Sequence, residues 1–236
     1  PAACLSNLNS TKHNWAFQGE PEPELNGRQV QHDRGKVLGG SSSINGMVFV
    51  RGNALDYEGW RQSGCEGWGY ADVMPYFKRM ETYSGGEDDF RGIDGPLHVH
   101  RAEPKEPLAL AFIEAGKQAG YKTTDDISGY CQEGFGVFDR TVFKGERWST
   151  ARAYLDPVRS RSNLTVVTHA LVQRLVINEN RATGVIYQNG KGRLVSASAI
   201  REVILSAGAV GSPHLLMLSG IGPEDHLESM GIDVKA

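Results

Sequence analysis

Residues 34–51 read RGKVLGGSSSINGMVFVR, and this stretch decides how the rest of the chain is interpreted. Four glycines and three consecutive serines stand here among apolar residues. Glycine allows positive φ and close backbone approach, while serine hydroxyls and free N–H groups can bind an anion or a ring edge. A flexible linker is the alternative, but linkers do not carry apolar residues at this density. We therefore predict a cofactor cradle, and call residues 34–51 the cradle.

Length and composition indicate a globular protein. The chain has 236 residues, 39% of them hydrophobic and 22% charged, which suits one or two domains with a buried core. No segment approaches the ~20 apolar residues needed to cross a bilayer, and no signal peptide is visible. We expect a cytoplasmic or peripherally membrane-associated protein. The net charge of −3 gives no electrostatic reason to expect nucleic-acid binding.

Cysteines and histidines give little support for a metal site. Cys4, Cys65 and Cys131 are widely spaced without a C-x-x-C pair, so neither a disulfide framework nor a zinc site is indicated. His98 and His100 alternate and would share one face of a strand, but no third ligand is indicated. We predict no metal.

Periodicity and turn chemistry predict a mixture of helices and strands. Helices are expected at 53–60, 70–83, 108–119, 151–155, 212–218 and 224–230, with N-caps at Asn53 and Ser149 and a proline start at Pro213. Strands are expected at 28–31, 134–138, 140–143, 164–168, 171–177, 183–188, 193–198 and 202–206. Those from 164 to 198 form a meander, the apolar run at 203–205 suits a strand buried on both faces, and residues 84–96 suit a mobile loop.

Two motifs, in this order, resemble a known family. RGKVLGGSSSINGMVFVRG resembles the first signature of the glucose–methanol–choline (GMC) oxidoreductases, and GAVGSPHLLMLSGIGP at 208–223 resembles the second. Between them, TDDISGYCQEGFGVFDRTV and RWSTARAYLDP are most similar to the choline dehydrogenase branch. The resemblance covers essentially the whole chain.

The resemblance implies an α/β fold, α+β overall. It assigns residues 1–59 and 156–236 to parts of a discontinuous FAD-binding domain, and residues 60–155 to a partial antiparallel-sheet substrate domain or lid. The family's G-x-G-x-x-G turn and catalytic histidine region find no match, so the chain is interpreted as an internal fragment, expected to be inactive in isolation.

Alcohol oxidation needs a hydride acceptor that side chains cannot supply. The resemblance implies FAD, and hence an FAD-dependent alcohol dehydrogenase, with choline as substrate, betaine aldehyde as product and a respiratory electron acceptor as partner. It would serve betaine biosynthesis, with peripheral membrane association possible. The alternatives are another alcohol dehydrogenase of the family, and a flavin-containing hydroxynitrile lyase.

The resemblance also implies cofactor contacts. In the cradle they are Val37, Gly39, Gly40, Ser41, Asn45, Gly46, Met47 and Val48. Val172 falls where the family contacts adenine through backbone atoms. Some relatives attach FAD through a histidine at the position of Ile44, and isoleucine cannot form that bond, so we predict dissociable FAD. His214 and His226 do not match the catalytic position, and no catalytic residue is assigned.

Overall fold

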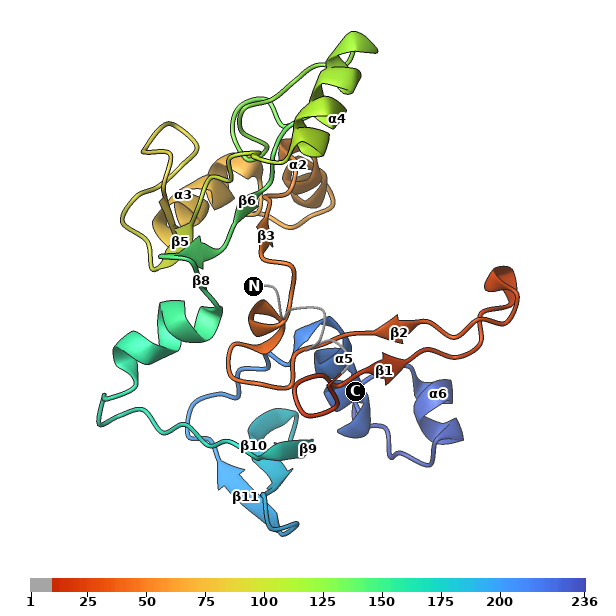
Figure 1. The fold of residues 1–236 in the computed structure, drawn as a ribbon. Helices are drawn as coiled ribbons and strands as arrows, with labels where there is room; N and C mark the ends of the chain where they lie inside the picture. The colour runs from red at the N-terminus through yellow and green to blue at the C-terminus, as the bar shows by residue number, and fades with distance from the viewer. Residues whose placement is uncertain (1–9) are drawn as a thin grey trace. The chain divides into compact units, whose positions relative to one another are not determined.

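A computed structural model describes residues 10–236, which divide into two compact units. The first comprises the described residues up to Leu164, and the second runs from Thr165 to Ala236 (Figure 1). Cys4 lies outside the described residues. Helices and strands occur in both units, as expected for the α/β class. The three-part domain division stays a prediction.

The first unit combines short strands with three α-helices. Its strands are β1 (Phe17–Gln18), β2 (Gln31–His32), β3 (Val48–Phe49), β4 (Glu81–Tyr83), β5 (Leu97–Val99), β6 (Asp139–Arg140), β7 (Val142–Phe143) and β8 (Glu146–Arg147). Its α-helices are α2 (Ala54–Gln62), α3 (Tyr70–Met80) and α4 (Pro107–Gln118). Short 3-10 helices cover Pro23–Leu25, Gly40–Ser43 and Asp156–Val158, and a π-helix covers Ala151–Leu155.

Local signals explain where two of these helices begin. Asn53 caps α2 as predicted: its Oδ1 accepts from Leu55 N at 2.9 Å, and Asp56 Oδ2 accepts from Asn53 N at 3.1 Å. Asp72 Oδ2 accepts from Gly69 N at 3.0 Å in the same way at the start of α3. Side chains thus satisfy backbone donors that have no partner inside the helix.

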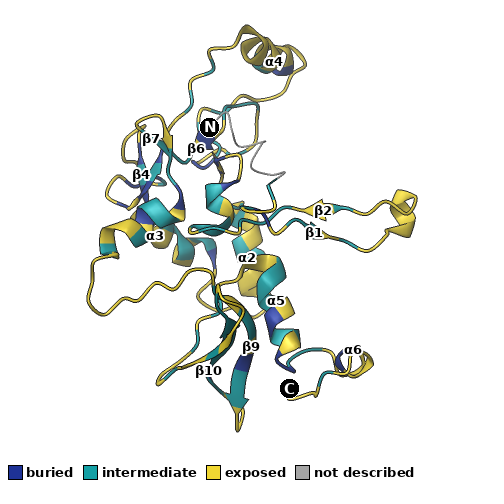
Figure 2. Ribbon diagram, turned by 60° about the horizontal axis from the view of Figure 1, so that its bottom comes forward, coloured by how far each residue is buried: buried dark blue, intermediate teal, exposed yellow. Residues whose placement is uncertain are grey.

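The core of the first unit lies where distant strands meet. β3 pairs antiparallel with β6, and β4 pairs parallel with β5. The buried residues packed together here are Phe49, Tyr83, Leu97, Val99 and Ala153. β3 lies within the cradle and its Phe49 belongs to this core, so the core anchors one end of the cradle. Figure 2 shows buried segments in dark blue around β4.

In the second unit, β9 (Leu171–Asn178), β10 (Arg181–Gln188) and β11 (Leu194–Ser198) form an antiparallel meander, in the order β11-β10-β9, from three of the four strands predicted for it. Helix α5 (Gly208–Leu218) contacts β9, and α6 (Glu224–Ser229) follows. Ser219 at the end of α5 accepts a hydrogen bond from Leu175 N at 2.8 Å and donates to Leu215 O at 2.6 Å. This buried hydroxyl ties the helix to the sheet.

Three predicted strands are wrong. Residues 164–168 and 202–206 form no strand, and Ile204 is 79% exposed. A strand requires a hydrogen-bonded neighbour, and within residues 10–236 no segment pairs with either run. Residues 134–138, also predicted as a strand, form only an isolated bridge at Phe135. The predicted strand at 28–31 overlaps β2 at Gln31 alone, and the one at 140–143 divides between β6 and β7.

Three helix predictions also need correction. Residues 151–155 form a π-helix preceded by Thr150, which has helical φ, and no side chain caps it; Ser149 is buried instead. Helix α5 begins at Gly208, so Pro213 lies inside it. The helix expected at 108–119 forms as α4, but its apolar side chains do not pack into a core, since Leu110 is 49% and Phe112 66% exposed and only Gly116 is buried.

The segment 84–96, predicted to be a mobile loop, has a buried centre. Arg91 and Gly92 are buried, and Gly92 O accepts from Tyr83 N at 2.8 Å. The loop is therefore fixed at its middle.

Among the helices of residues 10–236, none has the length and apolar character that crossing a membrane requires.

Candidate functional site

The cradle is a closed turn held by its own hydrogen bonds. After Gly39, whose φ is 84°, residues Gly40–Ser43 make one 3-10 helix. Ser42 Oγ donates to Gly39 O at 2.5 Å, and Ser43 Oγ donates to Leu38 O at 2.8 Å. The serines thus satisfy backbone carbonyls inside the turn, which a linker would leave to water.

The glycines of the cradle are of two kinds. A Cβ on Gly35 would lie 2.2 Å from Gly40 O, and one on Gly39 would lie 2.6 Å from Ser43 Oγ, so both are needed for packing. At Gly40 and Gly46 a Cβ would meet no atom within 4 Å. These two glycines therefore leave backbone that no side chain covers, and we call this uncovered part of the cradle its open face.

The predicted contact residues differ in how accessible they are. Ser41, Asn45, Gly46 and Val48 are exposed. Val37, Gly39 and Gly40 are half-buried. Met47 is buried, and its backbone groups are already bonded, N–H to Asn45 Oδ1 at 3.0 Å and C=O to Thr141 N at 2.9 Å. Met47 is thus placed to hold the shape of the cradle rather than to present a free group.

Residues 147–150 fasten the cradle from outside through hydrogen bonds to Ser42 and Asn45. Arg147 Nη1 donates to Asn45 Oδ1 at 2.8 Å and to Ser42 O at 3.1 Å. Thr150 N donates to Ser42 Oγ at 3.0 Å. The similarity of the segment RWSTARAYLDP to the family was the only signal that could have indicated this role.

A buried ionic cluster lies at the end of the cradle. We define the ionic cluster as Arg51, Glu81, Arg91, Asp126 and Asp139. Arg51 pairs with Glu81, and Arg91 lies 3.3 Å from Glu81, 3.4 Å from Asp126 and 2.8 Å from Asp139. Arg91 also stacks on the ring of Tyr83 at 3.7 Å. The cluster joins cradle, strands and the segment 84–96.

The charge of the ionic cluster does not balance. Two guanidinium groups face three carboxylates, so one negative charge is in excess. Burial raises the pKa of Glu81 and of Asp139, although Arg91 and other cations oppose this. Desolvation therefore outweighs pairing, as expected where charges leave water. The cluster is a structural feature, since four of its five members are buried and Asp126 is half-buried.

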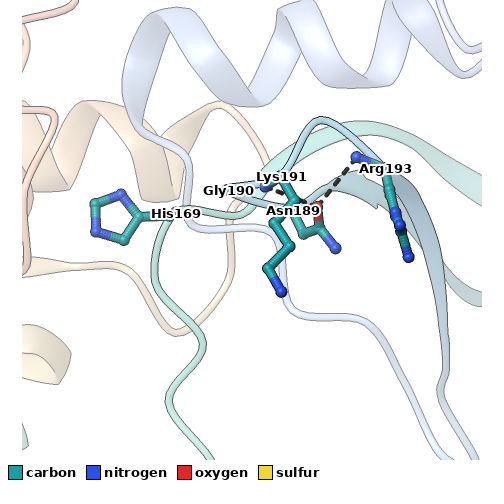
Figure 3. A pocket seen from close by; sticks show the side chains of 5 residues that line it. All are labelled: His169, Asn189, Gly190, Lys191 and Arg193. Carbon is teal, nitrogen blue, oxygen red and sulfur yellow. Dashed lines mark hydrogen bonds between the residues drawn. The ribbon is translucent and has the colours of Figure 1, made fainter.

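Val172 belongs to the second unit. It lies on β9 opposite Tyr187 and is half-buried. The same end of the sheet has an open pocket of about 690 Å³, lined by His169, Asn189, Gly190, Lys191 and Arg193 (Figure 3). Asn189 Oδ1 accepts from Lys191 N and Arg193 N, each at 3.0 Å, which shapes this turn.

The histidines do not form a metal site in the described part of the chain. The ring of His98 stacks on that of Phe143, with 3.8 Å between the ring centroids, and meets the ring of Trp148 edge-on, with 4.9 Å between the centroids. Burial, with help from Lys144, lowers the pKa of His98. Across residues 10–236, no group of three or more His, Cys, Asp or Glu residues could hold a metal ion. His214 and His226 are exposed on α5 and α6.

Comparison with known proteins gives consistent matches. A family model described as GMC oxidoreductase matches residues 5–234. An oxygen-dependent choline dehydrogenase of Rhizobium etli is 56% identical over 236 residues, all of this chain and 43% of that protein. Pyridoxine 4-oxidase from Mesorbium loti has a similar structure, with TM-score 0.93 and 33% identity over 99% of this chain and 46% of that one. An FAD-dependent oxidoreductase from Chaetomium thermophilum matches with TM-score 0.88 and 29% identity, over 94% and 41%.

Proposed function

The chain belongs to the GMC oxidoreductase family, and on this premise we propose that the protein is an FAD-dependent alcohol dehydrogenase that oxidises choline to betaine aldehyde. The chain spans 43% of the length of the Rhizobium etli choline dehydrogenase, to which it is 56% identical. That similarity supports choline over the substrates of the structurally similar proteins, whose identities to this chain are lower.

The open face of the cradle carries the proposal. Gly40 and Gly46 leave backbone uncovered, and the exposed Leu38, Val48 and Val50 lie in the same stretch. Apolar side chains beside bare backbone suit a flat heteroaromatic ring, which gains contact area without displacing side chains. The residues present thus fit the FAD that the family implies. Bound FAD would supply the hydride acceptor that alcohol oxidation needs.

The chain's own residues would bind the FAD and orient it. The exposed Ser41 and Asn45 offer polar groups at the edge of the open face, and Val48 offers apolar surface. In the second unit, Val172 has backbone groups on β9 and is the proposed adenine contact. A base must lie within hydrogen-bond reach of the substrate hydroxyl. None of the described histidines is assigned that role.

We propose that FAD is bound without a covalent link. Ile44, at the position where some relatives carry a linking histidine, is only 4% exposed. Its side chain is therefore directed into the protein and away from the open face, besides lacking a nucleophilic atom. Denaturation of the holoprotein should release all the flavin into the soluble fraction, and flavin that stays on the polypeptide would contradict this.

The electron acceptor has two candidates. The resemblance to the choline dehydrogenase branch predicts a respiratory acceptor, and peripheral membrane association would accompany it. The Rhizobium etli relative is instead named as an oxygen-dependent enzyme, which makes oxygen the second candidate. Reoxidation of the choline-reduced protein by air-saturated buffer, compared with reoxidation by a soluble quinone under argon, would distinguish them. A respiratory acceptor predicts faster reoxidation by the quinone.

The decisive experiment is anaerobic mixing of choline with the complete flavin-loaded protein. We expect rapid loss of the oxidised flavin absorbance, followed by release of betaine aldehyde. Bleaching by other alcohols alone would transfer the proposal to another alcohol dehydrogenase of the family. No bleaching by any alcohol, with cleavage of a cyanohydrin, would favour the hydroxynitrile lyase.

A further inference from the structure

Arg147 reaches from β8 to the part of the cradle that holds the greatest backbone strain. Met47 has φ 65°, a left-handed conformation that a bulky residue rarely adopts. Its N–H is held by Asn45 Oδ1 at 3.0 Å, and Arg147 Nη1 donates to that same oxygen at 2.8 Å. Strained residues persist where surrounding contacts fix them, and they occur often at binding sites.

Arg147 also brings a positive charge to the cradle. Among residues 10–236 no carboxylate pairs with it, and its two hydrogen bonds go to the neutral Asn45 amide and to Ser42 O, both from Nη1. Its Nη2 and Nε have no partner within the described residues. By contrast, Arg152 in the same segment is paired with Glu146.

We propose that Arg147 is a positioning residue of the cofactor site, which acts through Asn45 to fix residues 45–47 and adds a positive charge beside the bound ring. This inference rests on the proposed function. Charge-assisted hydrogen bonds are about twice as strong as neutral ones, and the planar guanidinium donates in a fixed geometry that an ammonium cannot copy. A cation near the ring favours the electron-rich form of the flavin.

The test compares Arg147→Gln, Arg147→Lys and the control Arg152→Gln in the complete holoprotein. We expect Arg147→Gln to weaken FAD binding roughly tenfold and to make the flavin midpoint potential more negative. Arg147→Lys should keep the potential close to that of the wild type but not recover the affinity. An FAD affinity and potential of Arg147→Gln equal to those of the control overturn the inference.

A double-mutant cycle with Asn45→Ala distinguishes positioning through Asn45 from a general destabilisation of the cradle. If Arg147 acts through Asn45, the double variant should bind FAD no more weakly than the worse single variant. Additive losses would contradict the inference. If Arg147→Gln does not fold, Arg147→Lys decides, because unchanged affinity overturns the inference. Failure of the proposed function is distinguishable, since the wild-type protein would then bind no FAD or not be bleached by alcohols.

Discussion

The cradle and the ionic cluster share Arg51 but are stabilised in opposite ways. The cradle is half exposed, and its turn is closed by neutral hydrogen bonds from serines to backbone, each worth ~1 kcal/mol, with Arg147 as the one charged group that bonds to it from outside. The ionic cluster is largely buried and is held together by a small number of desolvated ion pairs. A cofactor cradle needs accessible backbone, whereas the support behind it must not move. Rigidity and accessibility are thus provided by adjacent but separate groups.

Removal of Arg91 should have the largest effect on the stability of the fold. Arg91→Met leaves three carboxylates facing Arg51 alone, so we expect a loss of about 3–5 kcal/mol in the free energy of unfolding. Denaturant unfolding of the complete protein measures this, with the exposed Arg79→Met as control. Equal stability of the two variants would show that the cluster does not support the fold.

Gly35→Ala tests the closed side of the cradle. The new methyl would lie 2.2 Å from Gly40 O, which is backbone and cannot rotate away. We expect a loss of about 1–3 kcal/mol in unfolding free energy. Gly59→Ala in α2 is the control, since that site is open, and it should be neutral or stabilising. A Gly35→Ala protein as stable as the control would contradict the geometry of the turn.

Glu81→Gln should have the smallest effect on stability and an informative pH dependence. Burial raises the pKa of Glu81 above its ordinary 4.5, so the folded chain keeps a proton that the unfolded chain releases. The stability of the wild type therefore falls as pH rises from 4.5 through the raised pKa. Glutamine cannot ionise, so the stability of the variant relative to the wild type should rise over that range. At neutral pH we expect a smaller loss than for Arg91→Met, because glutamine keeps the shape of the side chain and two arginines then face two carboxylates.

Unfolding curves at about pH 5 and about pH 7 measure this dependence. The exposed Glu87→Gln serves as control, because no burial acts on that carboxylate. A relative stability of Glu81→Gln that falls with pH would mean that the arginines, not desolvation, dominate in the ionic cluster.

Local features of the fold could be predicted from the sequence. The cap at Asn53, the meander and the glycine-rich turn depend on residues close together in the chain, so their signals are local. The strand predicted at 202–206 does not form, because a strand depends on a neighbour that its own residues do not specify. The same holds for the exposed face of α4.

The support of the candidate site could not be predicted in this way. The ionic cluster joins positions 51, 81, 91, 126 and 139, and no spacing relates them. Arg147 and Asn45 are likewise separated by 102 residues. Individually each of these charged residues resembles an ordinary surface residue. Only the folded chain shows which of them are desolvated or bonded to the cradle.

The most direct test of the cofactor cradle is the FAD affinity of Gly46→Leu in the complete protein. A Cβ at this position would meet no heavy atom within 4 Å, so we expect the fold to tolerate leucine while the side chain extends over the open face. Gly59→Leu, at another open glycine outside the cradle, controls for the substitution itself. We predict FAD binding at least roughly tenfold weaker for Gly46→Leu, about 1.4 kcal/mol, with an unfolding midpoint equal to the control. FAD affinity equal to that of Gly59→Leu would contradict the assignment of this face to the cofactor.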